Sequence, residues 1–281
     1  MINLKERLMK IAFLMTACVS IAAVILICIF LFVNGVPAIS KIGIFQFLSG
    51  TTWKPANNLY GILPMIAGSL YVTAGALLFG VPVGILTAVF MARFCPPWLY
   101  KIMKSAVNLM AGIPSVVYGF FGLVVLVPFV RETFGGRGMS VLTASILLGL
   151  MILPTIISVS ETSIQAVPQS YYEGGLALGA SHERTVFYTV LPAAKSGIFA
   201  GIVLGLGRAA GETMAVMMVS GNQAVIPEKI TSGVRTLTTN IVMEMGYSTD
   251  LHRDALIATA VVLFAFILII NWSLSLLKQK C

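Results

Sequence analysis

Two charged side chains stand inside a long apolar run, where a charge is costly. Arg208 and Glu212 lie within the run Ile198–Val219. In a helix, a spacing of four residues places both side chains on one face. Arg208 comes about ten residues into the run, which is near mid-membrane at a rise of about 1.5 Å per residue. Charges at that depth are paired, face water or serve a function.

The chemistry open to this pair is the binding of an oxyanion. A guanidinium has a permanent positive charge and several hydrogen-bond donors, which suit an oxyanion. An ionised Glu212 only accepts hydrogen bonds, so it would repel a fully deprotonated anion and accept a bond from a protonated one. The pair thus favours hydrogen phosphate over sulfate. The alternative is a self-neutralising pair that orients the helix or locks two subunits.

Composition identifies the class of protein that must position these residues. The 281-residue chain is 58% hydrophobic and 10% charged, with a mean hydropathy of +0.97, whereas soluble domains carry about 25% charged residues. The net charge is +8, but the basic residues sit at the ends of apolar runs, which argues against nucleic-acid binding. Neither the four cysteines nor the two histidines have metal-ligand or disulfide spacing. An all-α integral membrane protein is predicted.

Apolar runs of the length needed for a span, about 20 residues, recur about six times. The first run is longer than a signal-peptide core of about 7–15 residues, so it is interpreted as an uncleaved helix. We expect residues 1–62 to form an N-terminal transmembrane helix and outer loop, and residues 63–281 a permease-like core of about five transmembrane helices. The expected runs are 11–33, 64–92, 107–130, 141–159, 198–219 and 255–277.

The distribution of basic residues predicts the orientation. Six alternating spans put both termini, the loop 93–104 and the segment 161–195 on one side, and the basic residues near the spans are denser there, as on a cytoplasmic side. The residues on this side are Lys5, Arg7, Lys10, Arg93, Lys101, Lys104, Arg184, Lys195, Lys278 and Lys280.

Glycines and prolines within the runs indicate closely packed helices. Gly197, Gly201 and Gly205 form a row that allows close backbone approach. Pro82 and Pro114 are expected to interrupt helical hydrogen bonds at membrane depth. Moving helices around a pathway would account for this pattern, and ordinary bundle packing explains the glycines equally well.

A polar island, residues 168–192, interrupts the apolar runs. Ser170 and Glu173 have capping-box spacing, so a short helix is expected from about Tyr171. Gly179 fits the position just after that helix. Ser181 can cap a second helix that runs toward Pro192. We interpret the island as a docking surface for an energy-supplying partner.

The island resembles the cytoplasmic EAA loop of ABC importer permeases. The matching residues are Glu173, Gly179 and the pair Leu191-Pro192, while Gly174 and Gly175 replace the two alanines of the pattern. Further stretches resemble the PstC-type permease family of phosphate ABC transporters. These stretches are Trp53-x-Pro55, Tyr60-Gly-Ile-Leu-Pro64, Ala111-Gly-Ile-Pro-Ser-Val-Val-Tyr-Gly-Phe120 and Gly205-Leu-Gly-Arg-Ala-Ala-Gly-Glu-Thr-Met-Ala215.

The resemblance implies a type I ABC importer permease of the cytoplasmic membrane that carries phosphate. Its implied partners are a PstA-like permease, two PstB-like ATPases and a PstS-like binding protein. No nucleotide-binding Gly-rich loop is present in the sequence, so this chain is expected to bind no cofactor and the ATPases to use ATP. The pathway residues expected are Arg208, Glu212, Ser115 and Tyr118. The ATPase-coupling residues expected are Glu173, Gly179, Ser181, Leu191 and Pro192.

Other functions stay open from the residues alone. A secondary transporter would be expected to show internal repeats and more intramembrane carboxylates, and a channel would not need the island. A membrane enzyme lacks a nucleophile–base or metal constellation in the spans. Within the resemblance, sulfate or molybdate as substrate and a PstA-type identity remain alternatives. The segment 220–254, with Arg235, Thr236, Thr238, Thr239 and Asn240, is expected to be a solvated loop rather than a gate lining.

Overall fold

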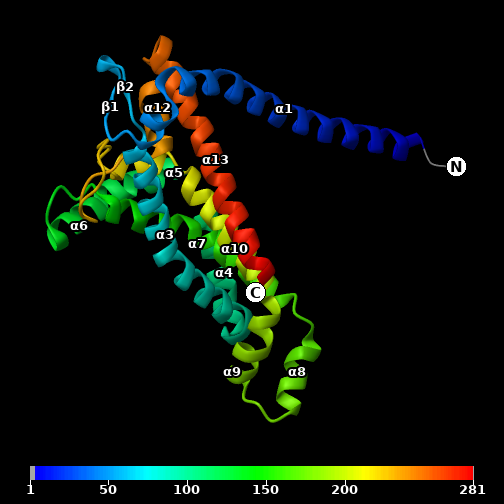
Figure 1. Cartoon of the computed structure of the whole chain (residues 1–281). Helices are drawn as coiled ribbons and strands as arrows, with labels where there is room; N and C mark the ends of the chain where they lie inside the picture. The colour runs from blue at the N-terminus through cyan, green and yellow to red at the C-terminus, as the bar shows by residue number, and fades with distance from the viewer. Residues whose placement is uncertain (1–3, 281) are drawn as a thin grey trace.

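Helices make up most of residues 4–280, which the computed structural model describes, with side chains for residues 6–273 (Figure 1). The side chains of Lys5, Lys278 and Lys280 therefore lie outside the described residues. The elements are α1 (Leu4–Ile42), α2 (Ile44–Ser49), β1 (Trp53–Lys54), η1 (Pro55–Asn57), β2 (Leu59–Tyr60), α3 (Leu63–Val89), η2 (Phe90–Phe94), α4 (Pro97–Gly112), α5 (Ser115–Phe121), η3 (Gly122–Leu126), α6 (Val127–Phe134), α7 (Val141–Gln165), α8 (Gln169–Ala177), α9 (His182–Thr185), η4 (Val186–Val190), α10 (Leu191–Gly211), α11 (Met214–Val219), α12 (Leu237–Met245) and α13 (Asp250–Lys280).

Six helical segments of the described chain are long and apolar enough to cross a membrane, so the predicted all-α membrane fold is confirmed. They are Glu6–Ile42, Leu63–Phe94, Ser115–Phe134, Val141–Gln165, His182–Gly211 and Asp250–Ser273. β1 and β2 form a small antiparallel hairpin that pairs Trp53 with Tyr60. We call the end of the bundle with this hairpin and α12 the hairpin end, and the opposite end the α8 end (Figure 1).

Several expected boundaries are wrong. The first helix continues to Ile42, so part of the expected loop is helical. The third expected run is divided, because Ile113 is extended and Pro114 supplies no N–H to continue α4. Residues 97–112 consequently form a separate helix, and the span starts at Ser115. Pro82, in contrast, lies inside α3 without ending it.

The buried centre of the bundle is α7, which packs between α3 and α10. Its side chains Leu147, Ile152 and Ile156 are fully buried. A Cβ added to Gly205 would lie 2.9 Å from Ile156, and one at Gly201 would lie 3.2 Å from the Ser160 hydroxyl. The predicted close approach along this glycine row is thus confirmed, with α7 as the neighbour.

The first helix behaves differently from the other spans. The part of α1 that packs lies against α13, while its N-terminal part extends away from the bundle (Figure 1). In its most apolar stretch, 0% of the residues are buried within the chain. The bundle that positions the site is therefore built by the helices from α3 onward.

Candidate functional site

Helix α10, which completes the fifth membrane-spanning segment, ends at Gly211. This end lies between Arg208 and Glu212, the charged pair predicted from the sequence. Glu212 has an extended backbone, with φ −70° and ψ 130°, and α11 begins two residues later. The Glu212 carboxylate accepts a hydrogen bond from the Ala215 N–H at 3.1 Å, so it caps the new helix. Arg208 lies in the last turn of α10. The expectation of one continuous helical face carrying both charges is wrong.

Arg208 and Glu212 do not neutralise each other. Among the described side chains, neither takes part in any of the ion pairs. Both are half-buried. A guanidinium without a carboxylate partner, next to a helix break, has donors that can bind an external anion. Among the described side chains, the Arg208 guanidinium thus has no carboxylate partner, while one Glu212 oxygen caps α11.

The segment expected to be a solvated loop folds back against this break. Thr236 caps α12 through the Thr239 N–H, and the side chains of Thr239 and Asn240 are fully buried. Thr238 donates a hydrogen bond from its hydroxyl to the Glu212 carbonyl at 3.1 Å. The prediction of a solvated loop is wrong because this Thr-rich run can cap a helix. A narrow crevice, too small to admit a water molecule, is lined by Ser69, Val72, Thr73, Leu148, Ala209, Ala210, Glu212, Val216, Thr236 and Thr238.

The other two predicted pathway residues lie on α5, which packs against α11. A Cβ at Gly119 of α5 would lie 3.0 Å from the Ala215 Cα. Ser115, the first residue of α5, is half-buried. Tyr118 is 7% exposed, donates its hydroxyl to the Met110 carbonyl at 3.0 Å, and lies within reach of the Arg208 charge. Tyr118 thus fixes the turn between α4 and α5 beside the break.

The polar island forms two short helices at the α8 end (Figure 1). α8 starts at Gln169, directly after Pro168, and its N-cap makes no side-chain hydrogen bond. Ser170 and Glu173 are exposed. The predicted capping box between them is wrong, because the helix begins two residues earlier than expected and Ser170 already lies inside its first turn.

The predicted end of this helix is confirmed. Gly179 has φ +82°, and its N–H donates to the Leu176 carbonyl at 2.9 Å. The Ala180 N–H donates to the Gly175 carbonyl at 3.2 Å. These two bonds form a Schellman motif, which needs a left-handed residue such as glycine.

Ser181 caps the second helix, as predicted, by accepting the Arg184 N–H at 3.3 Å. This helix does not end at Pro192. It passes through the π-helical turn η4 and continues from Leu191 as α10. The wider turn accommodates a proline, which cannot donate a backbone hydrogen bond. One helical segment, His182–Gly211, therefore joins the island to Arg208.

Aromatic residues attach the island to the end of α3. The Tyr172 hydroxyl and His182 Nδ1 lie 2.7 Å apart, which ties α8 to α9. The Phe94 ring packs edge-on against His182 with centroids 4.6 Å apart. Arg93 lies over the Tyr172 ring and donates to the Ile164 carbonyl at 3.2 Å. Sequence spacing gave no signal for the contacts of Arg93 and Phe94, because they join residues more than 70 positions apart.

Large apolar side chains of the island face outward. Leu178 is 91% exposed and Tyr188 is 79% exposed. Tyr171 and Phe187 are also exposed. Next to them is an open depression lined by Ser181, Glu183, Arg184, Phe187 and Tyr188. Exposed apolar side chains gathered on a polar knob are typical of a surface that binds another protein.

Two buried carboxylates were missed by sequence reasoning. Glu161 lies beyond the expected fourth run, yet α7 continues past it and leaves it 1% exposed. Its oxygens accept from Lys104 Nζ at 2.7 Å and from the Tyr100 hydroxyl at 2.6 Å. This cluster fixes α4 against the C-terminal half of α7. The pairing of Lys104 with Glu161 could not be read from spacing, since 57 residues separate them.

The second carboxylate, Glu244, is the centre of a cluster at the hairpin end. It binds Arg235 Nη1 at 2.7 Å, His252 Nε2 at 2.9 Å and Trp53 Nε1 at 2.8 Å. The Trp53 ring also packs against Tyr60, and burial raises the pKa of the Tyr60 hydroxyl. The four residues Trp53, Arg235, Glu244 and His252, here called the outer clamp, join the hairpin, α12 and α13.

Solved structures share this architecture. The MetNI methionine ABC transporter in an inward-facing conformation aligns with a TM-score of 0.64 at 20% identity, over 82% of this chain and 99% of that chain. A bacterial ABC transporter involved in the import of alginate aligns with a TM-score of 0.62 at 16% identity, over 98% of each chain. The fold is that of the membrane subunits of ABC importers.

The sequence comparisons define the family. Residues 80–281 match the binding-protein-dependent transport system inner membrane component family, and the chain belongs to this family. It is a multi-pass inner-membrane protein. It is 41% identical to the probable ABC transporter permease protein YqgH of Bacillus subtilis, over 92% of this chain and 88% of that protein. It is 34% identical to the phosphate transport system permease protein PstC of Mesorhizobium japonicum, over 87% of this chain and 81% of that protein.

Proposed function

We propose that this chain is a permease subunit through which an ATP-driven importer passes inorganic phosphate. The observation that carries the proposal is the helix break after Gly211, which leaves Arg208 and Glu212 half-buried and unpaired with each other. Relatives named phosphate transport system permease protein PstC, at 31–34% identity, support phosphate as the substrate. They also favour a PstC-type over a PstA-type identity.

Substrate recognition follows from the two charges. The Arg208 guanidinium donates to the oxygens of the anion, and the Glu212 carboxylate accepts a hydrogen bond from its protonated oxygen. Sulfate and molybdate, which are fully deprotonated at neutral pH, would meet the Glu212 charge without a proton to share. Ser115 supplies a further hydroxyl at the start of α5, and Thr238 holds the Glu212 carbonyl in place. Tyr118 positions α5 through its hydrogen bond to the Met110 carbonyl.

Coupling to ATP hydrolysis runs through the island. The exposed Leu178 and Tyr188 form the docking surface for an ATPase, and Glu173 and Ser181 lie on the same island. From His182 to Gly211 the helix is continuous, which is about 45 Å at a rise of about 1.5 Å per residue. Movement of the island therefore tilts the helix that carries Arg208. Gly179 forms the turn between α8 and α9. Leu191 and Pro192 connect this part of the island to α10.

The assembly in this proposal contains four kinds of subunit. A PstA-like permease pairs with this chain, two PstB-like ATPases dock below, and a PstS-like protein delivers phosphate on the far side. The ATPases use ATP, and this chain binds no cofactor. Both termini and the island lie in the cytoplasm, in line with the basic residues near that end.

Transport by the complete complex in proteoliposomes tests the proposal. With ATP inside, labelled phosphate should enter and unlabelled sulfate or molybdate should compete weakly. Arg208→Gln should lower uptake more than tenfold, and Arg208→Lys should retain part of it. Phosphate uptake that is unchanged in Arg208→Gln, or that continues without ATP, would refute the proposal. Preferred uptake of sulfate or molybdate would reassign the substrate.

A further inference from the structure

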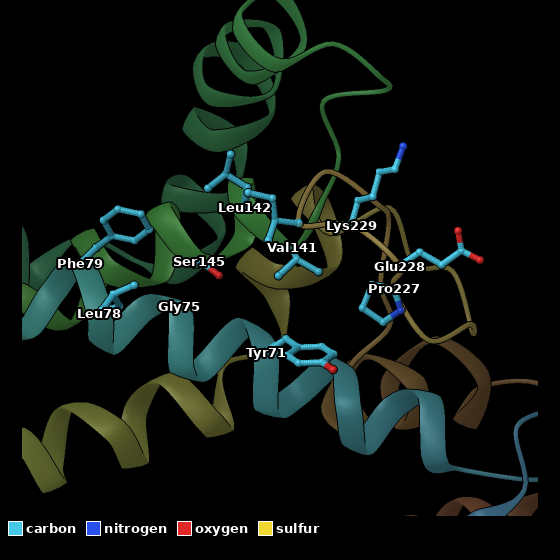
Figure 2. A pocket seen from close by; sticks show the side chains of 11 residues that line it. Tyr71, Gly75, Leu78, Phe79, Val141, Leu142, Ser145, Pro227, Glu228 and Lys229 are labelled. Carbon is cyan, nitrogen blue, oxygen red and sulfur yellow. The ribbon is translucent and has the colours of Figure 1, made fainter.

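An apolar groove lies between α3 and α7 near the hairpin end. Its cavity volume is about 400 Å³. Leu78 and Phe79 stand at one end of it, and Figure 2 shows Glu228 and Lys229 at the other, with their charged tips directed away from the apolar walls. Tyr71 lies between the two ends (Figure 2). The groove is thus amphipathic along its length.

The apolar part extends further along the same two helices. A second cavity shares Phe79 and continues to Val83 and Leu153, with purely apolar walls. From Tyr71 to Val83, α3 rises about 18 Å at about 1.5 Å per residue. Half the hydrocarbon core of a bilayer is about 15 Å. The groove therefore has the length of one acyl chain in one leaflet.

The charged rim is held in place by backbone hydrogen bonds. The Leu142 N–H donates to the Ile230 carbonyl at 2.9 Å, and the Val141 N–H donates to the Ser232 carbonyl at 3.0 Å. The Ser232 N–H in turn donates to the Lys229 carbonyl at 3.0 Å. These bonds also satisfy the first N–H groups of α7. The backbone carrying Glu228 and Lys229 is consequently fixed over the mouth of the groove.

We propose that this groove binds one phospholipid whose headgroup carries both a phosphate and a primary ammonium group. Its acyl chain lies along α3 and α7, the Lys229 ammonium binds the phosphate, and the Glu228 carboxylate accepts from the lipid ammonium. A headgroup with only negative charge would be opposed by Glu228. An apolar groove of one acyl-chain length beneath one positive and one negative side chain matches a lipid of this kind.

Native mass spectrometry of the complete complex tests the proposal. The complex, purified in detergent, is exchanged with phosphatidylethanolamine or phosphatidylglycerol of identical acyl chains. We expect one retained phosphatidylethanolamine per chain and weaker retention of phosphatidylglycerol. Leu78→Trp should remove the retained lipid. Leu86→Trp, at a similarly exposed position of α3 outside the groove, should keep it.

The rim variants test the headgroup without changing the apolar walls. Lys229→Ala should weaken retention about fivefold, the effect of about one basic side chain at a membrane surface. Glu228→Gln should remove the preference against phosphatidylglycerol. Both side chains are exposed, so these variants fold even where Leu78→Trp does not.

Three results would overturn the proposal. The first is equal retention of the two lipids by the unmodified complex. The second is unchanged retention in both Leu78→Trp and Lys229→Ala. The third is a photo-reactive group at position 79 that captures another protein chain instead of lipid, because that result would make the groove a contact between subunits.

Discussion

The outer clamp and the helix break each contain an arginine and a glutamate, and the two regions use them in opposite ways. In the clamp, Arg235 and Glu244 form a 2.7 Å ion pair that the hairpin and α13 complete. At the break, Arg208 and Glu212 form no such pair with each other. Satisfied charges hold elements together, whereas charges left open can bind a ligand.

The clamp should respond to mutation with the largest loss of stability. Glu244→Ala leaves the half-buried Arg235 charge without its carboxylate, and breaking a buried pair costs about 3 kcal/mol or more. We expect a lower midpoint of thermal unfolding and a reduced amount of assembled complex in the membrane. Glu132→Gln, at an exposed carboxylate, is the matched control. Equal stability of the two variants would contradict a structural role for the clamp.

The break should respond in transport instead. Arg208→Gln removes a charge-assisted contact of about 2 kcal/mol with the anion, which corresponds to a loss of uptake of more than tenfold. The thermal midpoint should stay within the error of the unmodified complex, because no ion pair of the described side chains is lost. A large loss of stability would show that Arg208 belongs with the clamp as a structural charge.

The turn at Gly179 should affect coupling and not the binding of phosphate. At φ +82°, a proline cannot adopt the required backbone, since its ring fixes φ near −65°. Gly179→Pro should therefore leave insertion in the membrane intact and lower the phosphate transported per ATP hydrolysed. Gly174→Ala is the control, because a Cβ there meets nothing within 4 Å and its φ is not positive. Unaltered stoichiometry in Gly179→Pro would contradict coupling through the island.

Features that depend on neighbouring residues could be predicted from the sequence. The six spans, the Schellman turn at Gly179 and the Ser181 cap follow from apolar length and from local hydrogen bonding. Features that depend on distant residues could not. Glu161 and Lys104 meet across the bundle, and Thr238 reaches the backbone of Glu212 from a segment that is polar enough to resemble a solvated loop.

The break itself illustrates the limit. An arginine and a glutamate four residues apart predict one helical face, and nothing between them is a proline. The helix ends there because Glu212 caps α11 and its carbonyl is taken by Thr238. The first contact is local, but the second comes from a residue 26 positions away and forms only in the folded chain. The sequence predicted that an arginine and a glutamate lie here. It did not predict that the helix ends between Arg208 and Glu212 and that they form no ion pair with each other.

The smallest predicted effect tests whether the Thr-rich segment supports the break. Thr238→Val removes the neutral hydrogen bond from the Thr238 hydroxyl to the Glu212 carbonyl, worth about 1 kcal/mol, together with the bond between the Thr238 and Thr236 hydroxyls. We expect a rise of a few-fold in the phosphate concentration needed for half-maximal uptake. Because the Thr238 bond is to the backbone and not to the ligand-facing charges, the rate at saturating phosphate should change little.

Thr133→Val provides the comparison, since Thr133 is exposed and bonds only to its own helix. If Thr238→Val instead lowered the saturated rate and left the phosphate dependence unchanged, α12 would act on the movement of α10 and not on the geometry of the site. The clamp and the break would then be linked parts of one moving unit, because the same helix, α12, carries both Glu244 and Thr238.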